Sequence, residues 1–145
     1  MKNLLTSFLL LLATIVLVQM SGCTKPDPAP VTNKTFPIEG LWIGNYTVNG
    51  EAGLGQQYYS FVIKPDGKMI ADTKGANQQH LSIGNWTLNG TTLTTNHTCV
   101  YGISFNVGVV QTTTATWANT GKIIGTWSHV APASGSGTFT LTRVN

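Results

Sequence analysis

The feature that most constrains the fold is an alternation of apolar and polar side chains that runs through the chain from Phe36 onward. Successive side chains of a β-strand point to opposite faces, whereas a helix repeats about every 3.6 residues. This part of the sequence has no helical period, and its abundant threonines and aromatics favour strands. The alternation therefore predicts an all-β domain over residues 36–145.

Turn signals divide this region into about eight segments. Asn49-Gly50, Pro65-Asp66-Gly67, Asn89-Gly90 and Asn119-Thr120-Gly121 supply residues that tolerate a positive φ angle, as tight hairpins require. The predicted strands are 40–49, 57–64, 68–74, 80–89, 91–101, 107–118, 122–130 and 137–145. Sequential strands with one apolar and one polar face favour an eight-stranded antiparallel up-and-down β-barrel, because closure removes both exposed edges.

The start of the chain has the pattern of an export signal. Lys2 is followed by an uncharged, mostly apolar run from Leu4 to Val18, which is shorter than the roughly 20 residues of a spanning helix. The run leads into Ser21-Gly22-Cys23, which resembles the lipobox of bacterial lipoproteins. The resemblance implies that residues 1–22 are a signal peptide and that Cys23 becomes the lipidated N-terminus. The alternative is an ordinary secretory signal cleaved at the small residues.

Residues 23–35 contain Pro26, Pro28 and Pro30, show no periodicity and predict a flexible tether. By the resemblance to lipoproteins, Thr24 stands where an aspartate would indicate retention at the inner membrane. We therefore expect a lipid anchor in the outer membrane of a bacterial cell envelope, with either leaflet possible.

Charge and catalytic groups are too sparse for several functional classes. Only 9% of residues are charged, and the net charge of +3 is scattered, which argues against nucleic-acid binding. The five acidic residues suggest no catalytic pair, and His80, His97 and His129 lack metal-site spacing. Cys99 is interpreted as a small buried side chain. We therefore expect no enzyme, no metal and no cofactor.

A Gly-x-Trp motif occurs three times, at Gly40-Leu41-Trp42, Gly84-Asn85-Trp86 and Gly125-Thr126-Trp127. The first copy opens the first predicted strand, and Arg143 lies on the last. This combination is similar to lipocalins and the wider calycin group, and with the lipobox it resembles small lipocalin-like lipoproteins of Bacteroidetes-type bacteria. The resemblance implies that Gly40, Trp42 and Arg143 close one end of the barrel, with Arg143 across the Trp42 ring.

The predicted inner face mixes aromatic and polar side chains. A purely structural core favours Leu, Ile and Val, whereas a ligand cavity combines an aromatic wall with a few polar groups. The same side chains could instead fill a narrow eight-stranded barrel, and the sequence leaves both interpretations open. The candidate ligand-lining residues are Tyr46, Trp86, Thr95, His97, Tyr101 and Trp127.

Two functional hypotheses follow. In the first, a membrane-anchored lipocalin-like barrel binds a small apolar or amphipathic ligand. In the second, a non-enzymatic envelope protein with a solid core acts on a protein or glycan partner as an inhibitor, adhesin or accessory subunit. The contacts in the second case would come from the loops at 50–57, 75–80, 102–107 and 130–137.

Overall fold

The computed structural model describes residues 37–144, apart from residues 76, 77, 118 and 120. The predicted signal peptide, Cys23 and the predicted tether at 23–35 lie outside the described residues. No helix within the described ranges has both the length and the apolar character needed to cross a bilayer.

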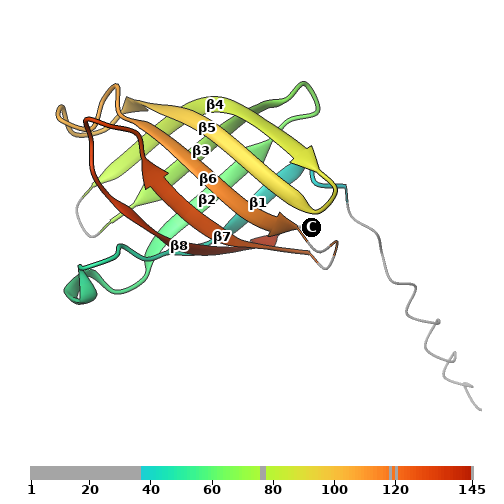
Figure 1. Ribbon diagram of the computed structural model, residues 1–145, viewed down its shortest axis with the longest axis horizontal. Coiled ribbons are helices and arrows are strands. Elements are labelled where there is room, and N and C mark those ends of the chain that lie inside the picture. Colours follow the sequence, from blue (N-terminus) through green and yellow to red (C-terminus); the bar gives the residue numbers. More distant parts are fainter. Residues whose placement is uncertain (1–36, 76–77, 118, 120, 145) are drawn as a thin grey trace, which may run out of the picture. The chain divides into compact units, whose positions relative to one another are not determined.

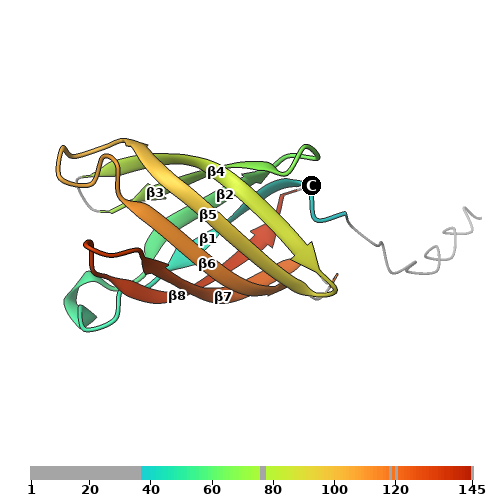
Figure 2. The same cartoon turned by 45° about the horizontal axis from the view of Figure 1, so that its top comes forward.

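The described part of the chain folds into a closed antiparallel barrel in which each strand pairs with the next and β1 pairs with β8 (Figure 1). The strands are strongly inclined to the barrel axis (Figure 2). The predicted fold class is therefore confirmed. The strands are β1 Gly40–Tyr46, β2 Gln57–Ile63, β3 Lys68–Lys74, β4 Gln79–Asn89, β5 Thr92–Tyr101, β6 Val110–Trp117, β7 Lys122–His129 and β8 Ser136–Arg143.

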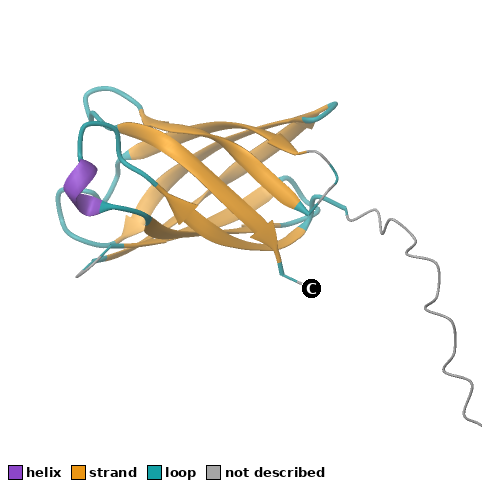
Figure 3. Ribbon diagram, turned by 90° about the horizontal axis from the view of Figure 1, so that it is seen from below, coloured by secondary structure: helices purple, strands orange, loops and turns teal. Residues whose placement is uncertain are grey.

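The two ends of the barrel differ in the connections that they carry. Short connections join β2 to β3 and β4 to β5 at the end where Trp42 and Arg143 lie, which we call the closed end. The connections β1–β2, β3–β4, β5–β6 and β7–β8 gather at the other end, which we call the open end. A short 3-10 helix, Ala52–Leu54, lies in the first of these loops (Figure 3).

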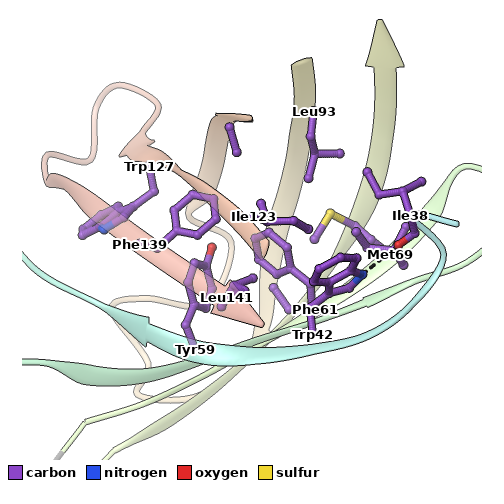
Figure 4. Close-up of a cluster of buried hydrophobic side chains, with 13 residues drawn as sticks. Ile38, Trp42, Tyr59, Phe61, Met69, Leu93, Ile123, Trp127, Phe139 and Leu141 are labelled. Carbon is purple, nitrogen blue, oxygen red and sulfur yellow. Dashed lines mark hydrogen bonds between the residues drawn. The ribbon is translucent and has the colours of Figure 1, made fainter. Parts of the chain in front are cut away.

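The half of the interior towards the closed end is filled with buried apolar side chains. Phe61 packs edge-to-face against Phe139, with ring centroids 5.6 Å apart. Trp42 donates a hydrogen bond from Nε1 to the Ile38 carbonyl at 2.7 Å, as the dashed line in Figure 4 shows. The same cluster includes Leu93, Ile123, Leu141 and Met69. These residues come from six of the eight strands and from the segment before β1. Their packing in the closed half therefore connects most of the strands of the barrel.

One register shift changes which side chains face inward. Leu81 pairs with Tyr101, but the next residue of β4, Ser82, pairs with Cys99, so β5 has one extra residue at Val100. Such a bulge shifts the side chains beyond it out of the regular alternation. Cys99 is buried, as expected, while Tyr101 is 65% exposed. The inward position predicted for Tyr101 is therefore wrong, because strict alternation assumed an unbroken strand.

Candidate functional site

The open half of the barrel contains a cavity of about 580 Å³. This volume lies in the range of typical small-molecule sites, about 300–1,000 Å³. The cavity reaches from buried side chains at mid-barrel to the loops of the open end. Its lining comprises Tyr46, Val48, Glu51, Leu54, Tyr59, Thr73, Gln78, His80, Ser82, His97, Cys99, Phe105, Asn106, Val109, Gln111, Trp127, His129, Ser134 and Gly135.

Three aromatic rings from β1, β2 and β7 form one part of this lining. The Tyr46 ring lies 5.5 Å from the Tyr59 ring and 5.8 Å from the Trp127 ring, with edge-to-face geometry in both pairs. Trp127 donates from Nε1 to the Thr47 carbonyl at 3.0 Å, which fixes the indole in place. The three rings therefore offer a pre-formed apolar surface, which suits planar or apolar ligands.

A row of polar side chains crosses β5, β6 and β7 at one level of the barrel. His97 pairs in register with Gln111, and Gln111 pairs with His129. Residues opposite each other in antiparallel strands place their side chains on the same face. All three line the cavity, so we call them the polar row.

The buried end of the polar row is joined to the aromatic surface by hydrogen bonds. Gln111 donates from Nε2 to the Tyr59 hydroxyl at 2.7 Å, and that hydroxyl lies 3.5 Å from Nε2 of His97. His97 is only 2% exposed, and its Nδ1 has no partner among the described residues. Burial, with a smaller contribution from the charge of His129, lowers the pKa of His97 to about 4. The imidazole is therefore neutral at neutral pH. Burial also disfavours the charged form of Tyr59, which raises the pKa of its hydroxyl.

The tautomer of His129 follows from its partner. Its Nδ1 lies 2.9 Å from the Ser134 carbonyl oxygen, which only accepts hydrogen bonds. Nδ1 therefore carries the proton in the neutral ring, and Nε2 has a free lone pair. The imidazole also lies 5.2 Å from the Trp127 ring, so the polar row and the aromatic surface meet at this residue.

All three histidines of the chain line the cavity. Nε2 of His80 lies 3.0 Å from the Asn106 amide nitrogen, and burial lowers the pKa of His80. Within the part of the chain that the structure describes, no group of three or more His, Cys, Asp or Glu side chains could hold a metal ion.

Of the six candidate lining residues, Tyr46, His97 and Trp127 line the cavity. Thr95 faces inward but lies one layer closer to the closed end, where its Oγ1 is 2.8 Å from Oγ1 of Thr113. It is fully buried below the cavity and does not line it.

Trp86 and Tyr101 also lie away from the cavity. The Trp86 indole packs against the core of the closed half and donates from Nε1 to the Lys64 carbonyl at 2.8 Å. Tyr101 is on the outer surface because of the bulge at Val100. Alternation gave the correct face for Trp86 but not its level along the barrel axis, whereas for Tyr101 it gave the wrong face.

Sequence reasoning missed Tyr59, Gln111, His80 and His129 as cavity residues. Tyr59 lies two residues before the buried Phe61 on β2, so alternation places both side chains on the inner face. Gln111 and His129 continue the inward alternation of Ala115 on β6 and Trp127 on β7 towards the open end. Extending the alternation to the strand ends would have found these two.

The closed end has the side-chain arrangement that the resemblance implied. The Arg143 guanidinium carbon lies 5.6 Å from the Trp42 ring centroid, and Nη1 donates to the Glu39 carbonyl at 2.6 Å and to the Pro37 carbonyl. Gly40 has a φ of +135°, and a Cβ there would lie 2.9 Å from the guanidinium. A glycine is therefore required for both backbone conformation and space.

No family model and no curated protein matches the chain. Two solved structures share the fold. The first, described as "EF1p2_mFAP2b bound to DFHBI", has a TM-score of 0.56 and 16% identity, covering 73% of this chain and 93% of the other. The second, "a redesigned beta barrel, mFAP1, bound to DFHBI", has a TM-score of 0.54 and 15% identity, covering 72% and 94%. At this identity the likeness shows the fold alone.

Proposed function

We propose that the protein is a non-enzymatic binding module that holds a small apolar or amphipathic molecule in the cavity at the open end. The observation that carries this proposal is the cavity itself, about 580 Å³ with an aromatic surface and a polar row. A barrel with a solid core would have this space filled by side chains. The closed half is filled in that way and serves as the structural core.

The solved structures of similar fold support a binding role. Both are barrels bound to DFHBI. A barrel of this architecture therefore holds a small ligand in those proteins, and we extend the role, but not the identity of the ligand, to this chain.

We further propose that the module is attached to the outer membrane of a bacterial envelope through lipid on Cys23. The support is the charged start, the apolar run and Ser21-Gly22-Cys23 in the sequence. Each buried methylene of an acyl chain contributes about 0.8 kcal/mol, so two or three chains give a lasting anchor.

The binding role is tested by titrating the full chain with a fluorescent apolar probe and with DFHBI while recording tryptophan emission. We expect saturable binding with quenching, because Trp127 lines the cavity. A Trp127→Phe variant should lose much of the quenching. A Trp86→Phe variant should keep it, since Trp86 lies in the closed half. Lack of saturable binding across fatty acids, sterols, haem and aromatic probes would contradict the proposal.

A second candidate function rests on the apolar rim of the open end. Phe105 is 75% exposed, and an apolar groove between the β5–β6 and β7–β8 loops is lined by Val107, Val109, Val130 and Pro132. Exposed apolar patches often mark interaction sites. This candidate predicts that Val107→Ser, at a groove residue outside the cavity lining, abolishes capture of a partner from the cell envelope without altering probe binding.

A further inference from the structure

Nδ1 of His97 has no partner but is buried, so the atoms of the polar row that remain open to a ligand belong to Gln111 and His129, and both are acceptors. In the neutral imidazole of His129, Nε2 has a free lone pair because Nδ1 donates to the Ser134 carbonyl. Gln111 uses its Nε2 to donate to Tyr59, and within the described residues no donor reaches its Oε1. The Tyr46 hydroxyl both donates and accepts, so it favours neither kind of ligand group. The row therefore presents two neighbouring acceptors to a ligand.

The charge of the lining disfavours an anion. None of the described lining residues is a lysine or an arginine, and Glu51 from the β1–β2 loop adds a carboxylate at the mouth. His97 is neutral at neutral pH. A ligand carboxylate placed beside His97 and Gln111 would lose its hydration without gaining a lysine or arginine partner, which is costly in an apolar environment.

The aromatic surface beside the acceptors favours a flat ligand. The ring centroids of Trp127 and Tyr46 lie 5.8 Å apart in edge-to-face geometry, and the centroid of the His129 ring lies 5.2 Å from that of Trp127. A ring packed against these side chains would bring a substituent within reach of Nε2 of His129.

From this arrangement we propose that the ligand is a neutral aromatic molecule carrying a hydrogen-bond donor, such as a phenol or an aromatic alcohol, whose donor meets Gln111 and His129. The inference rests on the proposed binding function and names the class of ligand. It excludes fatty acids and other carboxylates as the preferred ligands of this cavity.

The inference is tested with three ligands that share one ring system. Calorimetric titration of the full chain at neutral pH would compare 2-naphthol, which donates, 2-methoxynaphthalene, which only accepts, and 2-naphthoate, which is an anion. A neutral hydrogen bond is worth roughly a fivefold change in affinity. We expect 2-naphthol to bind about fivefold more tightly than the ether and the naphthoate to bind most weakly.

Two variants assign the effect to the polar row. Gln111→Leu and His129→Phe each remove one acceptor, so each should reduce the preference for 2-naphthol over its methyl ether. Thr112→Val is the matched control, because Thr112 is the next residue of β6 and pairs with Ser128 away from the cavity. The control should keep the preference.

The outcomes separate this inference from the proposed function. Saturable binding of all three ligands with equal affinity, or with the naphthoate strongest, would overturn the inference and leave the binding function standing. An absence of binding by all three ligands, DFHBI and the apolar probes would overturn both. Should a variant fail to fold, the comparison of the three ligands on the unaltered chain still decides the question.

Discussion

Trp42 shows how much of the closed end depends on single side chains. It is 0% exposed, its Nε1 is bonded to the Ile38 carbonyl, and its ring lies beneath the Arg143 guanidinium. Arg143 in turn holds the carbonyls of Pro37 and Glu39. The segment before β1 is thus fixed by one indole and one guanidinium.

We expect Trp42→Ala to destabilise the fold by about 3–5 kcal/mol, the usual cost of removing a buried Trp. Arg143→Ala should cost about 1–3 kcal/mol through lost charge-assisted hydrogen bonds and ring contact. Neither change should alter ligand affinity in molecules that remain folded. The neighbouring, outward-facing Leu41→Ala should change stability by less than about 0.5 kcal/mol. Equal urea midpoints for all three variants would show that the closed end does not depend on this contact.

His97 predicts a distinct pH dependence of stability. Its pKa is about 4 in the folded protein, below the value of about 6.5 for an unperturbed histidine. Between these values the unfolded chain binds a proton that the folded chain does not, so stability falls as the pH falls from about 6.5 towards 4. The contribution is at most about 1.4 kcal/mol per pH unit.

The measurement is the urea unfolding free energy at pH 7 and pH 5, in the unaltered chain and in His97→Phe. We expect a smaller loss at pH 5 in the variant, whatever its stability at pH 7. Identical losses in both proteins would show that His97 is not a buried neutral group.

At the scale of elements, close approach between strands depends on glycines. A Cβ on Gly125 of β7 would collide with the Thr114 carbonyl and with Ala115 of β6. A Cβ on Gly84 of β4 would likewise collide with the Asn96 carbonyl of β5. Two of the three Gly-x-Trp motifs therefore mark places where neighbouring strands leave no room for a side chain.

Gly125→Ala and Gly84→Ala should each destabilise the barrel by about 1–3 kcal/mol or more, since the added methyl group overpacks a rigid backbone contact. Gly53→Ala is the matched control, because nothing lies within 4 Å of a Cβ at that loop position. Thermal unfolding of the three variants provides the comparison. A Gly125→Ala variant as stable as Gly53→Ala would contradict the steric argument.

The eight strands could be predicted because period-2 alternation and turn residues are local signals. The bulge at Val100 could not be predicted, since it depends on how β5 pairs with β4. Alternation therefore placed Tyr101 on the wrong face. Trp86 and Thr95 were correctly placed on the inner face, but the level at which the core ends and the cavity begins depends on strand stagger across the whole barrel. Alternation alone does not contain that information.

At the scale of the whole molecule, the proposed lipid anchor and the cavity are separate in sequence. The described barrel begins after residue 36. Cys23 is the first residue of the proline-containing segment at 23–35, which precedes the barrel in the sequence. Attachment and ligand binding are therefore expected to be affected by different substitutions.

We expect Cys23→Ser to release the protein from membranes or to leave it as unprocessed precursor, because the thiol is the proposed site of lipid attachment. Membrane fractionation and metabolic labelling with a fatty acid are the measurements. Binding of the apolar probe by the variant should be unchanged. Equal labelling of Cys23→Ser and the unaltered protein would place the lipid elsewhere or exclude it.

The division of the interior into a filled half and a hollow half has a consequence for how such a protein diversifies. The filled half, with Phe61, Leu93 and Leu141, provides apolar packing that does not depend on a ligand. Substitutions in the polar row or in the open-end loops change the cavity without disturbing this packing. The same stable closed half can therefore support cavities of different ligand specificity.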